Sequence, residues 1–189
     1  ALLVPATAVV IAASLVLSMT RRELDGALTD WGLSFATALY VALPLAYFVA
    51  LRQLDRGVVW MLVALACTWA CDSAAYVVGR AIGRRPFSPR LSPKKTWEGT
   101  LGGLGAATAA GLLTTPLLAL PWAAALALGC AVGCAAIAGD LAESFIKRQL
   151  GVKDSGTLIP GHGGALDRLD SLLFAVPVVF YVAVLWGGR

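Results

Sequence analysis

Long apolar stretches follow one another along almost the entire chain, separated by short polar segments. A helix crosses the hydrocarbon of a bilayer with about 20 apolar residues. Six stretches approach this length, at residues 2–19, 31–51, 58–78, 99–117, 121–138 and 172–186. The first has no basic segment before it and no small-residue cleavage site after it, so we expect a spanning helix and not a signal peptide. The pattern predicts an all-α fold, a polytopic integral membrane helical bundle of about six transmembrane helices.

Composition supports the same class of protein. The 189 residues are 59% hydrophobic and only 14% charged, with a mean hydropathy of +0.79. A soluble domain is about 45–50% apolar and about 25% charged. An ordinary cytosolic domain and a disordered tail are therefore excluded.

The basic residues are distributed unevenly between the two ends of the predicted spans. Twelve of them belong to one side: Arg21, Arg22, Arg80, Arg84, Arg85, Arg90, Lys94, Lys95, Lys147, Arg148, Lys153 and Arg168. The other side holds Arg52, Arg56 and Arg189. Because cytoplasmic loops carry the excess of Lys and Arg, the long loops 80–98 and 140–171 are predicted to lie in the cytoplasm.

Small residues recur at helical spacing within the predicted spans. Gly99 and Gly103 are four residues apart, as are Gly129 and Gly133. This small-xxx-small spacing is typical of close helix packing in membranes. The four cysteines form two similar pairs, Cys67/Cys71 and Cys130/Cys134. They are expected to be packing residues, with a zinc site as the alternative.

Acidic residues lie where several predicted spans reach the cytoplasmic side. Asp72 is inside the third span, Asp140 follows the fifth, and Asp167 and Asp170 precede the sixth. A charge near the bilayer centre costs about 2.5–3.5 kcal/mol, so such a residue faces a cavity or a partner. Four carboxylates at one membrane face repel each other unless cations lie between them. Their oxygens suit Mg²⁺; for Asp72, pairing with a basic neighbour is the alternative.

Two polar segments carry further candidate chemistry. Residues 92–99 read Ser-Pro-Lys-Lys-Thr-Trp-Glu-Gly, and Lys and Thr beside a helix N-terminus are good phosphate ligands. We expect this segment to bind phosphate, with anchoring to anionic headgroups as the alternative. The single histidine, His162, lies in Pro-Gly-His-Gly-Gly, where the glycines let the backbone approach a ligand closely.

Taken together, these segments resemble the phosphatidate cytidylyltransferases, also called CDP-diacylglycerol synthases. The polar positions of that family's hallmark motif occur in order as Ser144, Lys147, Arg148, Lys153, Asp154, Gly156, His162, Gly163, Gly164, Asp167, Arg168 and Asp170. Residues 72–76, 79–80 and 92–99 also resemble the family. The likeness covers about residues 70–172, and so many polar positions in order make it specific.

The resemblance implies a reaction in which CTP and phosphatidic acid give CDP-diacylglycerol and pyrophosphate, with Mg²⁺ as cofactor. The attacking group is already a phosphate oxygen, so catalysis depends on positioning and charge neutralisation. The resemblance implies Asp140 and Asp167 as Mg²⁺ ligands, with Asp170 and Asp72 as further ligands or as residues that orient them. A second cation is left open.

The remaining roles are likewise implied by the resemblance. Lys147 and Arg168 join Asp140 and Asp167 as catalytic residues. The predicted substrate-binding residues are Ser92, Lys94, Lys95, Thr96, Glu98, Ser144, Arg148, Lys153, Asp154, His162, Gly163 and Gly164. His162 is expected to donate a hydrogen bond to a phosphate.

The expected organisation has two parts. Residues 1–55 carry no motif and are predicted to be N-terminal transmembrane helices, the remainder of a longer N-terminal part. Residues 56–189 are predicted to form the catalytic transmembrane domain. The expected partners are CTP, phosphatidic acid, the lipid bilayer and a second copy in a homodimer, with no nucleic acid. The active site is expected to face the cytoplasm from a cell or inner membrane.

Other function classes fit the residues less well. A CDP-alcohol phosphotransferase needs an Asp-Gly-x-x-Ala-Arg pattern, but Asp25-Gly26 is followed by Ala-Leu-Thr-Asp. An ion-coupled transporter would use Asp72 and Asp140 as cation ligands, yet the polar residues gather at one membrane face and no inverted repeat is visible. A P-loop nucleotide enzyme is excluded because the chain lacks Gly-x4-Gly-Lys-[Ser/Thr].

Overall fold

The computed structural model describes residues 3–152, 155–156 and 164–186. These residues form seven helices and two short strands. The elements are α1 (Leu3–Met19), α2 (Ala27–Gln53), α3 (Gly57–Ile82), β1 (Pro86–Ser88), β2 (Ser92–Thr96), α4 (Trp97–Leu113), α5 (Thr115–Leu118), α6 (Trp122–Gln149) and α7 (Leu166–Trp186). The predicted polytopic helical membrane bundle is confirmed.

The number of spanning helices agrees approximately with the prediction. Within the described residues, α2, α3, α6 and α7 are long and apolar enough to cross a membrane. The other two predicted spans correspond to α1 and α4, which are 17 residues long each. A helix of that length lies at the short end of the range for a transmembrane span.

The described chain divides into two compact units, Ala1–Leu43 and Pro44–Arg189. In the first, polar side chains join α1 to the start of α2. The indole N–H of Trp31 donates to Ser14 Oγ at 3.0 Å. Arg21 forms an ion pair with Asp30 at 2.6 Å.

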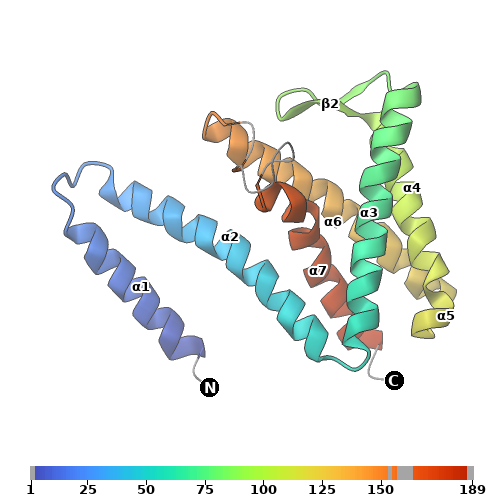
Figure 1. Ribbon diagram of the computed structural model, residues 1–189, viewed down its shortest axis with the longest axis horizontal. Coiled ribbons are helices and arrows are strands. Elements are labelled where there is room, and N and C mark those ends of the chain that lie inside the picture. The colour runs from blue at the N-terminus through green and yellow to red at the C-terminus, as the bar shows by residue number, and fades with distance from the viewer. Residues whose placement is uncertain (1–2, 153–154, 157–163, 187–189) are drawn as a thin grey trace. The chain divides into compact units, whose positions relative to one another are not determined.

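The second unit contains the packed core. Helix α3 packs against α4, α4 packs against α6, and α7 packs against both α6 and α3; Figure 1 shows α3 and α4 running side by side. The core is apolar and fully buried at Trp60 and Cys67 of α3, Leu128 of α6 and Val176 of α7. Dispersion contacts of this kind help to hold the four helices together.

Glycines permit the close approach of these helices, as their spacing predicted. A Cβ atom at Gly99 would lie 2.6 Å from the carbonyl oxygen of Ala75 in α3. At Gly129 it would lie 2.6 Å from the carbonyl oxygen of Ala107 in α4. At Gly139 it would clash with the carbonyl oxygen of Asp170 in α7. The small residues therefore set the distances between helices in the bundle. Gly139 sets the distance between α6 and α7 next to Asp140 and Asp170, two of the predicted site carboxylates.

Two helices continue into the segments expected to be loops. Helix α6 runs to Gln149 and so includes the first part of the predicted loop 140–171, while α7 begins at Leu166. The hydropathy pattern ends each apolar stretch at its first cluster of charges. Helical structure continues beyond that point because Glu143 and Lys147, four residues apart, pair along α6.

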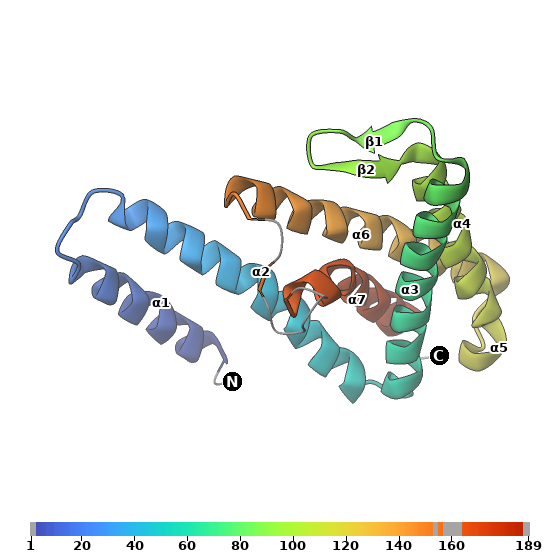
Figure 2. The ribbon, with the colours of Figure 1, turned by 45° about the horizontal axis from the view of Figure 1, so that its top comes forward.

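A small β-hairpin occupies most of the predicted loop 80–98 and was not predicted. Strands β1 and β2 are antiparallel, with Pro86 opposite Thr96 and Ser88 opposite Ser92. The rings of Phe87 and Trp97 pack edge to face with centroids 4.7 Å apart. Figure 2 shows the hairpin beside α6.

One pair of substitutions in α4 tests the glycine contacts. A Cβ atom at Gly111 would lie 2.7 Å from the carbonyl oxygen of Ala125, whereas one at Gly105 meets nothing within 4 Å. Gly111→Ala should destabilise the bundle by about 1–3 kcal/mol through overpacking. Gly105→Ala should be neutral or stabilising by up to about 1 kcal/mol, because alanine is the better helix former. Thermal unfolding in detergent measures both, and equal effects of the two variants would contradict this packing.

Candidate active site

A pocket with several charged residues in its lining lies within the second unit, between α3, α4, α6 and β2. Its volume is about 590 Å³, within the range of small-molecule sites. The lining residues are Cys71, Asp72, Ala75, Tyr76, Gly79, Arg80, Lys94, Lys95, Thr96, Gly99, Thr100, Ile137 and Asp140. Residues far apart in the sequence therefore converge on one space.

The pocket combines three basic side chains with two carboxylates. Lys95 Nζ lies 2.5 Å from Asp140 Oδ2, which joins β2 to α6. The side chains are only 25% and 33% exposed, respectively. The carboxylate of Asp72 lies near enough to Asp140 and Asp170 to repel both, and near enough to Lys95 to be attracted by it. The predicted gathering of Asp72, Asp140 and Asp170 is thus present, and a lysine lies among them.

One face of α3 supplies a second row of polar groups. Asp72, Tyr76 and Arg80 follow one another at four-residue spacing, and all three line the pocket. Arg80 Nη1 donates to the hydroxyl of Tyr76 at 2.9 Å. This contact restricts the guanidinium at the wall of the pocket, where it adds a fixed positive charge.

The hairpin that carries Lys94 and Lys95 is held at both ends. The side chain of Thr96 accepts the backbone N–H of Gly99 at 3.2 Å and so caps α4. Glu98 accepts the backbone N–H groups of Arg84 and Arg85 at 3.1 and 3.3 Å. The hydrogen bonds from Arg84 and Arg85 hold the pKa of Glu98 below its usual range. Glu98 therefore supports the hairpin and does not line the pocket.

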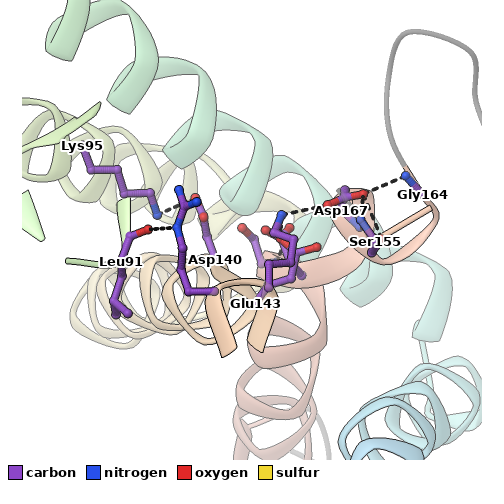
Figure 3. Close-up of polar contacts among 11 residues, drawn as sticks. Leu91, Lys95, Asp140, Glu143, Ser155, Gly164 and Asp167 are labelled. Carbon is purple, nitrogen blue, oxygen red and sulfur yellow. Dashed lines mark hydrogen bonds and ion pairs between the residues drawn. The ribbon is translucent and has the colours of Figure 1, made fainter. Parts of the chain in front are cut away.

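Neighbouring the pocket is a group of residues that we call the Lys147 cluster: Glu143, Lys147, Ser155, Gly164 and Asp167. Lys147 Nζ donates to Glu143 Oε2 at 2.6 Å and to Asp167 Oδ1 at 2.8 Å. The other oxygen of Asp167 accepts N–H and O–H from Ser155 at 2.9 and 2.8 Å, and N–H from Gly164 at 2.7 Å. Figure 3 shows the cluster on one side and the contact of Lys95 with Asp140 on the other.

Asp170 links the two groups electrostatically. It lies within range of Asp140 and Lys95 of the pocket and also of Lys147. The close contact of Gly139 with the backbone of Asp170 brings α6 and α7 together at this level. The pocket and the Lys147 cluster are therefore adjoining parts of one charged region.

The donor set of the pocket fits Mg²⁺. Among the described residues, no three acidic, thiol or imidazole groups are arranged to hold a metal ion by themselves. Mg²⁺ typically takes only one or two carboxylates and fills its octahedron with water and substrate phosphates. Asp72 and Asp140 offer such a pair, whereas both oxygens of Asp167 already accept hydrogen bonds. Shared ligation by Asp140 and Asp167 remains a prediction.

Other predicted site residues lie near this region without lining the pocket. Arg148 Nε donates to the carbonyl oxygen of Leu91 in the hairpin turn at 3.2 Å. Ser144 lies on α6, Ser92 begins β2, and Arg168 lies in the first turn of α7. Lys153, Asp154, His162 and Gly163 lie outside the described residues.

Several contributors were not among the residues predicted from sequence. Tyr76, Arg80 and Thr100 line the pocket. The four-residue spacing from Asp72 through Tyr76 to Arg80 is the signal that would have found two of them. Glu143 is 2% exposed within the Lys147 cluster, and its spacing from Lys147 gives the same signal.

The fold and site define a helical membrane protein with a cationic, carboxylate-containing pocket, and comparison with known proteins gives the family. The model of the "Cytidylyltransferase family" matches residues 2–186. The chain belongs to this family, so the predicted resemblance is confirmed at that level.

Named relatives share much of this chain. A protein of Synechocystis sp. named phosphatidate cytidylyltransferase is 47% identical over 136 residues, which cover 71% of this chain and 46% of the relative. One of the same name from Bacillus subtilis is 38% identical over 152 residues, covering 79% and 56%. The chain thus spans about half the length of these curated relatives.

A solved structure is also similar. It is described as an intramembrane enzyme for archaeal membrane lipids biosynthesis, with 29% sequence identity and a TM-score of 0.48. The match covers 69% of this chain and 85% of the other.

Protonation of Glu98 should loosen the hairpin. Because its folded-state pKa is lowered, its contacts stabilise the fold above the unfolded-state pKa and are lost as pH falls through the folded value. The protection of the Arg84 and Arg85 amides against hydrogen exchange should therefore fall as pH drops from about 7 to about 3, below the usual glutamate range. Glu98→Gln should remove this dependence. Protection that stays constant in the unmodified protein, after correction for intrinsic exchange, would contradict the assignment.

Proposed function

We propose that this chain carries the catalytic region of a phosphatidate cytidylyltransferase. The reaction joins CTP and phosphatidic acid to give CDP-diacylglycerol and pyrophosphate. The observation that carries the proposal is the pocket in which Lys94, Lys95 and Arg80 face Asp72 and Asp140. The names of relatives that match this part of the chain support it. Family membership also favours nucleotide transfer over the transporter alternative.

The geometry suits a reaction between two polyanions. An oxygen of the lipid phosphate attacks the α-phosphorus of CTP, and the bond from that phosphorus to the oxygen bridging the α- and β-phosphates breaks. Pyrophosphate leaves with the electron pair of that bond. The protein has to bring negative groups together and neutralise the charge that develops on them.

The basic residues of the pocket are assigned to the nucleotide. Lys95 exchanges its contact with Asp140 for a phosphate oxygen of CTP, and Lys94 and Arg80 bind neighbouring oxygens from β2 and α3. Thr96 adds a hydroxyl at the start of α4. Charge-assisted hydrogen bonds of this kind are stronger than neutral ones. They orient the α-phosphorus before attack.

Divalent metal belongs to the same proposal. Asp72 and Asp140 would hold Mg²⁺, with Asp170 and Asp167 as further candidates, and the ion would neutralise phosphate oxygens and polarise the α-phosphorus. When Lys95 turns to the nucleotide, the Asp140 carboxylate becomes available. Binding of CTP by Lys95 and binding of the metal ion by Asp140 are therefore compatible.

The second substrate is assigned to the region around Lys147. Lys147 lies seven residues, and so about 10 Å, along α6 from Asp140, and we therefore assign it to a different phosphate group from Lys95. Arg168 and Arg148 add positive charge nearby, and the predicted contacts of Lys153 and His162 would complete this side. The acyl chains would remain in the cytoplasmic leaflet, since the charge asymmetry of the loops favours a cytoplasmic site. The predicted homodimer remains part of the proposal.

A substrate panel tests this function. The intact protein, purified in detergent with Mg²⁺, is offered labelled CTP, dCTP or ATP together with phosphatidic acid or another lipid phosphate. We expect CTP and phosphatidic acid to give CDP-diacylglycerol and equimolar pyrophosphate. Absence of product with every pair would contradict the proposal.

Asp140→Asn should remove most of the turnover. The substitution keeps the size of the side chain but takes a carboxylate from the pocket, so kcat should fall by about 100-fold or more. Because Lys95 loses its charged partner, Tm should also fall, so turnover is measured well below the Tm of the variant. Asp25→Asn, a matched change in the segment between α1 and α2, serves as the control. An Asp140→Asn protein that keeps near-normal turnover would exclude Asp140 from the site.

Lys95→Ala should weaken CTP binding selectively. Loss of one hydrogen bond from a charged group costs about 1.5–3 kcal/mol, so the KM for CTP should rise at least about tenfold. The KM for phosphatidic acid should change by less than about threefold, because a different lysine is assigned to that substrate. Arg22→Ala provides a control for loss of a surface charge. Equal increases in both KM values would assign Lys95 to the architecture of the hairpin.

A further inference from the structure

Glu143 is a buried acidic residue that the proposed binding roles leave unexplained. It lies on α6, is 2% exposed, and does not line the pocket. Its Oε2 accepts a hydrogen bond from Lys147, while Oε1 is buried and has no hydrogen-bond partner among the described residues. A buried carboxylate is costly unless it is paired, so its position here requires an explanation.

The partner of Glu143 is the lysine assigned to substrate. Lys147 follows four residues later on the same face of α6, and its ammonium lies between Glu143 at 2.6 Å and Asp167 at 2.8 Å. The lysine side chain is 19% exposed. Two carboxylates from two helices thus fix a group that would otherwise rotate about four bonds.

Stability alone is a weak reason for this arrangement. Replacing a buried ion pair by apolar residues of similar volume is often neutral or stabilising. Asp167, by contrast, accepts hydrogen bonds from four donors, which belong to α6 and to the segment before α7. In the described part of the chain, the Glu143 side chain accepts its hydrogen bond from Lys147 alone, so we assign its contribution to that residue.

We propose that Glu143 is a positioning residue that holds the Lys147 ammonium at the substrate phosphate. The inference rests on the proposed function, because Lys147 is assigned there to the phosphate of the second substrate. Glu143 directs the lysine side chain along α6, and Asp167 holds its ammonium beside the first turn of α7. An ammonium has three N–H donors, so one remains for a phosphate oxygen once two carboxylates are bound.

A double-mutant cycle tests this assignment in the intact protein. The variants are Glu143→Gln, Lys147→Met and the two combined, with Glu23→Gln as a matched control in the segment between α1 and α2. For each we measure kcat, the KM for CTP and for phosphatidic acid, and Tm in detergent. If Glu143 acts only through Lys147, the two substitutions are strongly non-additive.

The expected kinetic result has three parts. Glu143→Gln lowers kcat at least about tenfold, because a neutral amide holds the ammonium less strongly than a carboxylate. It changes the KM for CTP by less than about threefold, since Lys95 binds that substrate. The double variant is within about twofold of Lys147→Met alone. Effects that multiply, or a Glu143→Gln protein with normal kcat, would overturn the proposal.

Thermal unfolding provides a readout that does not depend on activity. Glu143→Gln should lower Tm when Lys147 is present, because it weakens the pair. In the Lys147→Met background the same change should raise Tm, because it removes a buried charge that has lost its partner. A decrease of the same size in both backgrounds would overturn the pairing. An unmodified protein that forms no CDP-diacylglycerol would contradict the proposed function instead, and the Tm comparison would still report on the pair.

Discussion

The structure depends on keeping carboxylates paired where helices reach the edge of the apolar core. Asp140 is paired by Lys95 from the hairpin, and Asp167 by Lys147 from α6. Each pair joins elements that are distant in sequence. The same contact therefore neutralises a carboxylate and holds two elements together. A partly buried charge without a partner costs several kcal/mol. The lysines therefore determine which elements can meet at this end of the bundle.

Close helix packing makes these pairings possible. The absence of side chains at Gly99, Gly103 and Gly139 allows α3 to approach α4, and α6 to approach α7, at backbone contact. Without a hydrophobic driving force between helices inside lipid, such contacts and interhelical polar groups supply much of the association energy. The glycines are therefore part of the site, although none of their atoms carries chemistry. They place Asp72, Asp140 and Asp170 close enough to interact electrostatically with one another.

The sequence predicted the general features of this protein better than its local geometry. Hydropathy located the long helices because each apolar stretch has a length that a bilayer requires. It ended the apolar span of α6 at residue 138, because charged residues from Asp140 onward interrupt the apolar pattern although the helix continues to Gln149. It gave no sign of the hairpin, whose strands have three and five residues. Asp72 was found because a charge inside a span is rare, and Asp140, Asp167 and Asp170 because they lie where neighbouring spans reach the same side. Tyr76 and Arg80 were not, because an exposed tyrosine and a basic residue at a helix end have ordinary explanations.

The attachment of the hairpin has a consequence for the order of events at the pocket. Its two polar ties to α6 differ in kind: Lys95 binds a carboxylate through a side chain, while Arg148 binds the carbonyl oxygen of Leu91 in the turn. A nucleotide phosphate that binds Lys95 would compete with Asp140 for the first contact, whereas Leu91 and Arg148 do not line the pocket. The turn of the hairpin would keep its hydrogen bond to Arg148, while β2 loses its contact with Asp140. Binding in the pocket would therefore increase the mobility of β2, while the turn of the hairpin keeps its contact with α6.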